Sequence, residues 1–138
     1  MCSSDLDAVI EPHWPSAEDV IYINKEVLDE KGQSSFPRDR AGLESAVAKP
    51  INHFHYEGVE DLVSLATTLL FGIARNHPFE DGNKRTGLLA AVAFLETNGY
   101  TIDRYVSLGL STLIVHVLRG ALTEKQFADL LGPEVREI

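Results

Sequence analysis

Residues 77–85, HPFEDGNKR, bring together the residue types in this chain that could do chemistry. The segment holds one histidine, two acids, an asparagine and two bases, with a proline and a glycine among them. Histidine titrates near neutral pH, and as a general base it could take a proton from an attacking hydroxyl, which contributes about 10²- to 10⁴-fold in rate. A segment of buried core would not have this composition. We therefore examine it as the candidate site, with His77 as the candidate base.

The same segment has the features of an anion site. Pro78 and Gly82 predict a turn that leads into a helix. Backbone N–H groups from about Gly82 onward would lack carbonyl partners, and the helix dipole adds positive potential there, so such a helix start binds anions. Asn83 adds a neutral donor, and Lys84 and Arg85 add two cations. Two cations at a helix N-terminus are unfavourable unless a bound anion neutralises their charge, and a polyphosphate would do so.

Asp81 is a hard oxygen ligand that could hold the Mg²⁺ that accompanies a polyphosphate. Taken singly, these residues have plainer interpretations: His77 as a structural hydrogen-bonding residue, Asp81 as a turn residue, and the two cations as a solvated helix start. Phe79 is an apolar anchor under either interpretation. The joint spacing, and no single member, favours a functional site.

The length, composition and charge of the whole chain restrict the kinds of site that this segment can form. Its 138 residues are most simply one domain, and hydrophobic and charged fractions of 44% and 24% are ordinary for a globular protein. The formal charge of −9 argues against a broad surface for nucleic acid, so any anion site must be local. With one cysteine, no apolar run near the ~20 residues of a membrane span and no signal-peptide pattern, we expect a cytoplasmic protein without a membrane partner.

Several helices can be predicted. Residues 1–15 are interpreted as an N-terminal leader and residues 16–138 as a single domain. Ser16 is a predicted N-cap for a helix that ends at Gly32. A short helix, RAGLESAVAK, is expected to end at Pro50, since the residue before a proline is disfavoured in the helical region.

The next residues, 51–58 (INHFHYEG), show no helical stripe and predict an extended or hairpin-like connector on the surface. Apolar residues at spacings of three and four predict a central helix over 59–75. Three more helices are predicted over 84–99, 103–120 and 123–132, the last with a capping box of Thr123 and Gln126.

Residues 77–85 resemble the signature of the Fic/Doc family, H-x-F-x-[D/E]-G/A-N-[G/K]-R, and match each signature position. The similarity extends to RDRAGLESAVAKP upstream and to the helix that follows the motif, covers about residues 14–138, and favours the Doc (death-on-curing) toxin branch. The resemblance implies an all-α fold, a compact helical bundle with a short flap or hairpin near residues 51–58 over the site.

Carried over by position, the resemblance makes His77 the general base that acts on a hydroxyl of a target protein and Asp81 the Mg²⁺ ligand. It makes Gly82, Asn83, Lys84 and Arg85 the phosphate-binding nest, with ATP as co-substrate, and it leaves Phe79 as the structural anchor of the motif.

Two differences from the Fic branch that transfers AMP bear on the reaction. In the Fic branch that transfers AMP, glycine occupies the position of Lys84, and a second arginine follows the first by three residues, where this chain has Leu88. In Doc toxins the same differences accompany transfer of the γ-phosphate. A kinase-like phosphotransferase is therefore the first interpretation and AMP transfer (AMPylation) the alternative, with elongation factor Tu implied as a candidate target.

Regulation is expected from a partner. AMP-transferring relatives often carry an inhibitory S/T-x-x-x-E-G/N motif, but the pair Glu57-Gly58 is preceded at the required spacing by His53, which is neither serine nor threonine. Doc-type toxins are similar in this respect and are inhibited by a separate small antitoxin, so we expect such a partner.

Two interpretations of other classes stay open. The chain could be an interaction module that has lost activity and docks a peptide through residues 52–58, although no signature position is degenerate. It could also be a metallohydrolase that uses His77 and Asp81, or His53 and His55, as ligands. Zinc sites usually need three or four protein ligands, and the sequence supplies too few close together.

Overall fold

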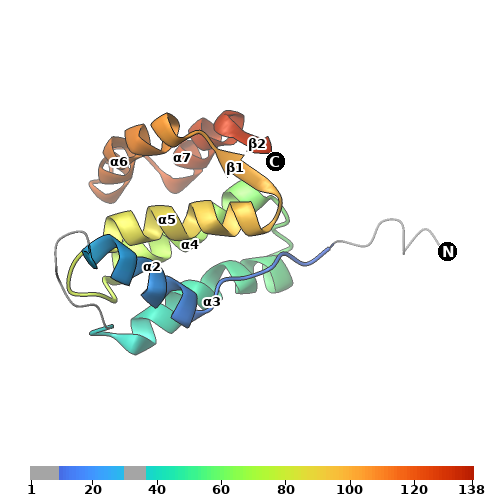
Figure 1. Ribbon diagram of the computed structural model, residues 1–138. Helices are drawn as coiled ribbons and strands as arrows, with labels where there is room; N and C mark the ends of the chain where they lie inside the picture. The colour runs from blue at the N-terminus through green and yellow to red at the C-terminus, as the bar shows by residue number, and fades with distance from the viewer. Residues whose placement is uncertain (1–9, 30–36) are drawn as a thin grey trace.

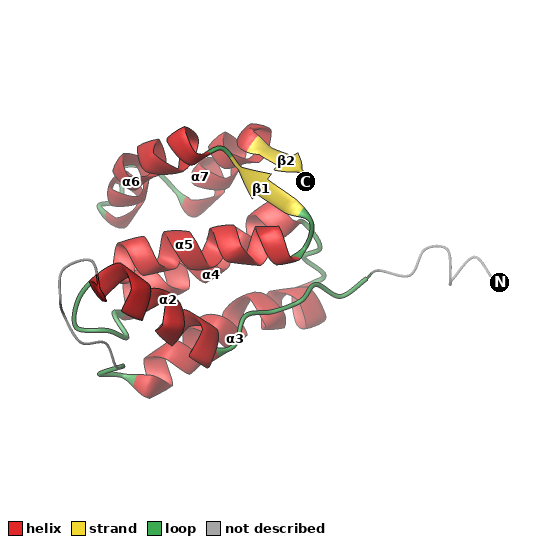
Figure 2. Ribbon diagram, in the orientation of Figure 1, coloured by secondary structure: helices red, strands yellow, loops and turns green. Residues whose placement is uncertain are grey.

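The computed structural model describes residues 10–29 and 37–138, and in that part the chain is a helical bundle with one small sheet. Figure 2 shows how little of it is strand. The expected all-α class is thus confirmed. The elements are α2 (Ala17–Asp29), α3 (Arg40–Glu57), α4 (Leu62–Asn76), α5 (Asn83–Thr97), β1 (Tyr100–Ile102), α6 (Arg104–Leu118), α7 (Glu124–Leu131), a 3₁₀ turn (Gly132–Glu134) and β2 (Val135–Glu137).

The antiparallel pair α4 and α5 forms the centre of the molecule. Figure 1 shows these two helices between α2 and α3 on one side and α6, α7 and the strands on the other. All ten residues from Leu65 to Ala74 are buried, because α4 is covered on every side. The two central helices approach closely at Gly87, where an added Cβ would lie 2.7 Å from the carbonyl oxygen of Leu70. The candidate loop is therefore the connection between the two most central helices.

The predicted flap at residues 51–58 is wrong in this structure, as is the predicted end of a helix at Pro50. Helix α3 continues through buried Pro50 to Glu57, and Gly58 ends it with a left-handed φ of 68° and an N–H donated to the carbonyl of His53. A proline inside a helix costs roughly 3 kcal/mol. Contacts of the second half of α3 offset that cost, among them an edge-to-face contact between Phe54 and Trp14 at 5.8 Å.

Helix starts follow the capping chemistry in the sequence. Ser16 and Asp19 exchange side-chain to backbone hydrogen bonds of 3.1 and 2.8 Å at the start of α2. Thr123 and Gln126 form the predicted capping box of α7. The predicted end of the first helix at Gly32 lies outside the described residues.

The segment 10–15 lies across the bundle. Trp14 stacks on Phe94 of α5 with ring centroids 5.5 Å apart, and the backbone of His13 exchanges two hydrogen bonds with the Asn98 side chain at 2.8 and 3.0 Å. Within the predicted leader, these residues thus contact the domain, while residues 1–9 are not described.

The small sheet was not predicted. Strand β1 pairs antiparallel with β2, so that Ile102 lies opposite Val135. Strands of three residues are too short to show a recognisable alternation in the sequence. Among the described residues, no helix is both long enough and apolar enough to cross a membrane.

Candidate active site

His77 lies where α4 ends, and its backbone has an unusual conformation. It is the non-glycine residue with a positive φ (47°) among those described, and its N–H donates to the carbonyl of Ile73 at 3.3 Å. The left-handed conformation costs an ordinary residue about 1–2 kcal/mol. Its side chain is exposed. The fold thus tolerates backbone strain to present this imidazole, a pattern common at functional sites.

Phe79 and Asn83 hold the loop closed behind His77. Phe79 is 1% exposed, and its backbone forms a bridge with Pro37. The Asn83 amide accepts from the Phe79 N–H at 3.0 Å and donates to the Phe79 carbonyl at 2.9 Å. The predicted neutral donor is therefore engaged with the loop through its side chain, and what Asn83 could offer an anion is its backbone N–H.

A second segment holds the loop from the side of α3. The backbone N–H groups of Arg38 and Asp39 both donate to the Pro78 carbonyl, at 2.9 and 3.1 Å, and the Arg38 guanidinium donates to the His77 carbonyl at 3.5 Å. In the sequence, Arg38 and Asp39 belong to the stretch RDRAGLESAVAKP that resembles the family, and no role at the site was predicted for them. Nothing in its composition indicates that its backbone would pair with residues forty positions further on.

The second end of the loop is the start of α5. Gly82 is the N-cap residue with φ 77°, and no side chain caps the helix there. Its N–H donates to Oδ1 of Asp81 at 2.8 Å. The first N–H groups of α5 therefore have no side-chain cap that would compete with an anion.

The predicted residues line one cavity of about 640 Å³. The lining includes His77, Asp81, Gly82, Asn83, Lys84 and Arg85, together with Glu80. Phe79 does not line it, as suits a buried anchor. The other lining residues, none of them predicted to be site residues, are Leu88, Leu89, Ser111, Ile114 and Val115. The cavity thus combines polar residues of the loop and the start of α5 with largely apolar residues further along α5 and on α6.

The donor set fits a polyphosphate with a divalent cation. Lys84, Arg85 and Asp81 are exposed at the helix start, which no side chain caps, and all three line the cavity together with a second carboxylate, that of Glu80. Magnesium usually keeps several waters and is bound by one or two carboxylates together with substrate phosphates. Asp81 is placed to be that carboxylate.

A metal site made of protein side chains alone has no support in the described part of the chain, where no three or more His, Cys, Asp or Glu residues group to hold an ion. His53 and His55 of α3, the second pair of proposed zinc ligands, each lie near a glutamate instead. His55 Nε2 lies 2.9 Å from a carboxylate oxygen of Glu11, and His53 Nε2 lies 3.7 Å from one of Glu57. The zinc hydrolase interpretation is not supported.

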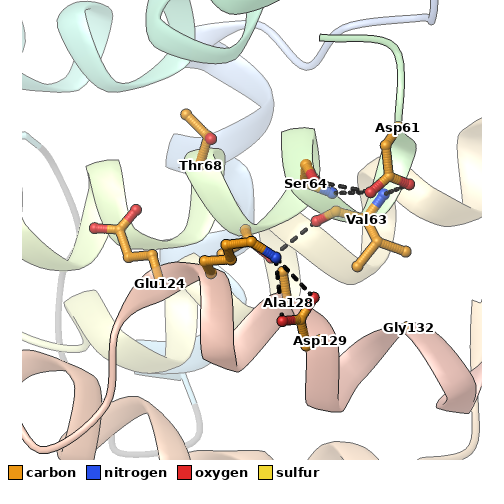
Figure 3. A pocket seen from close by; sticks show the side chains of 10 residues that line it. Asp61, Val63, Ser64, Thr68, Glu124, Ala128, Asp129 and Gly132 are labelled. Atoms are coloured by element: carbon orange, nitrogen blue, oxygen red, sulfur yellow. Dashed lines mark hydrogen bonds and ion pairs between the residues drawn. The ribbon is translucent and has the colours of Figure 1, made fainter.

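A second cavity, of about 610 Å³, lies between the start of α4 and α7 and has a more acidic lining (Figure 3). Asp61, Glu124 and Asp129 line it, and its lysine, Lys125, lies 3.3 Å from a carboxylate oxygen of Asp129. Figure 3 shows Glu124 and Asp129 on α7 and Asp61 at the start of α4. A lining so rich in carboxylates would repel a polyphosphate, so the cavity at His77 is the better candidate.

Comparison with known proteins identifies the family of the chain. The family model described as Fic/DOC family matches residues 14–95, which include the loop, α4 and most of α5. The chain belongs to the Fic/Doc family. It is 30% identical over 116 residues to "Protein kinase doc" of Escherichia phage P1, an alignment that covers 84% of this chain and 90% of that protein.

A second relative points to the same branch of the Fic/Doc family. The chain is 37% identical over 84 residues to "Toxin Doc" of Mycolicibacterium smegmatis, across 56% of this chain and 65% of that protein. Both relatives carry the Doc name, which supports the Doc branch. The family match ends within α5, so the apolar side that α6 gives the cavity lies outside it.

Proposed function

We propose that this chain is a Doc-like toxin kinase that moves the γ-phosphate of ATP to a hydroxyl side chain of a target protein. One observation carries the proposal: an exposed histidine, an exposed aspartate and two exposed cations line one cavity at the uncapped start of α5. This is the group of side chains that phosphoryl transfer needs, because the reaction depends on positioning and on charge stabilisation. The printed name of the phage relative, a protein kinase, supports the same reaction.

In this mechanism His77 accepts the proton of the target hydroxyl as that oxygen forms its bond to the γ-phosphorus. The bond from the γ-phosphorus to the oxygen that bridges it to the β-phosphate breaks, and ADP leaves with the electron pair. Lys84, Arg85 and the first N–H groups of α5 hold the phosphate oxygens. Mg²⁺, when bound at Asp81, neutralises charge that develops on the phosphates.

The position of Leu88 favours kinase chemistry over AMP transfer. Leu88 lines the cavity and is 7% exposed, where the AMP-transferring branch has an arginine. A leucine offers no donor to a phosphate, so among the lining residues the cationic groups are confined to the loop end, at Lys84 and Arg85. That arrangement suits one terminal phosphate group near His77. AMP transfer to a protein hydroxyl is the alternative.

The proposal includes two protein partners and a cellular compartment. The target is a protein with an accessible serine or threonine, with elongation factor Tu as the candidate that the family resemblance names. A small antitoxin is the proposed inhibitor, since His53 occupies the position where an internal inhibitory motif would have serine or threonine. Both partners would be met in the cytoplasm.

Labelled nucleotide tests the proposal. The protein is incubated with a cell lysate and Mg²⁺, and with ATP labelled at either the γ- or the α-phosphate. Label on a protein from γ-labelled ATP alone supports the kinase, and label from α-labelled ATP supports AMP transfer. Absence of both labels would leave the interaction module that has lost activity as the better account.

The control is His77→Asn. Asparagine tolerates the left-handed backbone of this position better than alanine does, so the fold should be kept while the base is lost. We expect transfer to fall by about 10²-fold or more, with ATP binding retained. Undiminished transfer by this variant would remove His77 from its proposed role.

A further inference from the structure

Asn24 of α2 is a buried polar side chain beneath the candidate loop that the mechanism above does not use. It is 0% exposed. Its Nδ2 donates to the carbonyl oxygen of Asp81 at 3.1 Å and lies 3.0 Å from Oγ1 of Thr86, to which it also donates. The two acceptors lie on either side of Gly82, one just before the start of α5 and one in its first turn. One buried amide thus contacts both parts of the helix start.

Helix α2 also packs directly on Gly82. A Cβ added to Gly82 would lie 3.4 Å from Nδ2 of Asn24 and 3.3 Å from Cγ1 of Val27. The left-handed φ of 77° and this close approach both favour glycine there. The position of the Gly82 backbone is therefore set by α2, which is separated from the loop by more than fifty residues.

The hydrogen bond from Asn24 to the Asp81 carbonyl also sets the direction of the Gly82 N–H, which belongs to the same peptide unit. The atoms of a peptide unit are coplanar, and in a trans peptide the C=O and N–H point in opposite directions. When Asn24 holds the Asp81 carbonyl toward α2, the Gly82 N–H points away from α2. That N–H donates to Oδ1 of the Asp81 carboxylate at 2.8 Å. The orientation of this carboxylate therefore depends on Asn24 through one rigid peptide.

We propose that Asn24 is a positioning residue for the Mg²⁺ and phosphate site, acting through the peptide between Asp81 and Gly82. This inference rests on the proposed function. Thr86 extends the effect to the helix, since its N–H donates to the Gly82 carbonyl at 2.8 Å while its hydroxyl is held by Asn24. Asn24 is absent from the cavity lining, so its effect on the site would pass through groups such as these.

The test uses Asn24→Leu, which keeps the branching of the side chain at Cγ and removes both donors. Mutation of a residue that orients a metal ligand through hydrogen bonds typically lowers metal affinity or activity by about 10- to 100-fold. We expect the Mg²⁺ concentration that half-saturates ATP binding, measured by calorimetry, to rise by about 10-fold or more. Thr86→Val removes one acceptor and leaves the bond to Asp81, so its Mg²⁺ requirement should stay nearer to the wild type.

Val20→Ala supplies the stability control. Val20 is 0% exposed on the same helix, one turn before Asn24, and its truncation lowers stability without removing a hydrogen bond to the loop. If Asn24→Leu leaves the Mg²⁺ requirement unchanged, or if Val20→Ala raises it equally, the positioning role is refuted. Should Asn24→Leu not fold, Asn24→Ser, whose hydroxyl is too short to span both acceptors, replaces it.

A second readout separates this inference from the proposed function. If the wild type binds no ATP with Mg²⁺, the proposed function fails, and hydrogen exchange at the Thr86 amide tests the positioning alone. That amide closes the first turn of α5 on the Gly82 carbonyl. Faster exchange in Asn24→Leu than in Val20→Ala supports the role of Asn24, and equal rates overturn it.

Discussion

At the scale of single residues, the loop contains exposed side chains that could take part in a reaction and buried side chains that hold the loop in its conformation. His77, Asp81 and Lys84 are exposed, whereas Phe79 and Asn83 are buried and bonded to each other through the Phe79 backbone. Substitution of the exposed set should change activity with little effect on stability. Substitution of the buried set should act first on the fold, because a buried group left without its hydrogen bond is costly.

Asp81 and Glu80 are adjacent carboxylates that line the same cavity, and they offer a matched pair. We expect Asp81→Asn to raise the Mg²⁺ concentration needed for half-maximal transfer by about 10-fold or more, because it removes the charged oxygen ligand. Glu80→Gln removes the same charge one position earlier and should have a much smaller effect. Kinetic titration with Mg²⁺ compares the two. Equal effects would mean that only the charge of the loop matters and that Asp81 is not the ligand.

Residue types and spacing were enough to predict which side chains would meet. The structure places His77 and residues 81–85 on one cavity. The sequence could not reveal Asn24 and Arg38, which hold the loop from distant positions, because their importance depends on which backbone groups the fold brings beside them. Nor could it show that the Asn83 amide is engaged with Phe79, since an asparagine at a helix start serves a loop or a ligand equally well.

At the scale of elements, the contact between α4 and α5 fixes the two ends of the loop. Gly87, the glycine of α5, packs directly against the backbone of α4 at Leu70. In Gly87→Ala the new Cβ would meet the Leu70 carbonyl at 2.7 Å, so one helix must shift. We expect a loss of about 1–3 kcal/mol in the free energy of unfolding, measured by urea denaturation.

Gly109 of α6 is the matched control, since a Cβ added there meets nothing within 4 Å. Gly109→Ala should gain up to about 1 kcal/mol from helix propensity. A Gly87→Ala protein as stable as the wild type would show that the central helices do not need this close approach.

Helix α3 shows how packing can override a local signal. Pro50 and the absence of an apolar stripe both predicted a break, yet the helix runs on to Glu57. The second half of α3 is stabilised by the Trp14 ring, which is a tertiary contact, and by the Gly58 cap at its own end. Helices α4, α5 and α7 were predicted well because their apolar residues or caps carry the signal locally.

At the scale of the whole molecule, the segment 10–15 joins the start of the described chain to α3 and α5. Glu11 is central to this junction, because one carboxylate oxygen accepts from Trp14 Nε1 at 2.7 Å and lies 2.9 Å from His55 Nε2. The bond from Trp14, with a smaller contribution from His55, lowers the pKa of Glu11 below its ordinary value of 4.5. The ionised carboxylate is therefore the form that the folded state favours.

This junction predicts a pH dependence of definite sign. Because the pKa of Glu11 is lowered on folding, its contribution is present above pH 4.5 and is lost as the pH falls through the lower pKa of the folded state. Trp14 is the single tryptophan, so its fluorescence should change over that range while circular dichroism still shows helix. In Glu11→Gln, which cannot titrate, the change should be absent. The same acid transition in both proteins would place its origin elsewhere.

The central claim is that the start of α5 accepts the phosphates of a nucleotide, and calorimetric titration of ATP with Mg²⁺ tests it most directly. Arg85→Ala is compared with Lys125→Ala, which removes the same charge beside the other cavity. The account predicts that the wild type and Lys125→Ala bind ATP alike and that Arg85→Ala binds about 10-fold more weakly or worse, as the loss of a charge-assisted contact of about 1.5–3 kcal/mol implies. Unchanged affinity in Arg85→Ala, or no binding by the wild type, would contradict it.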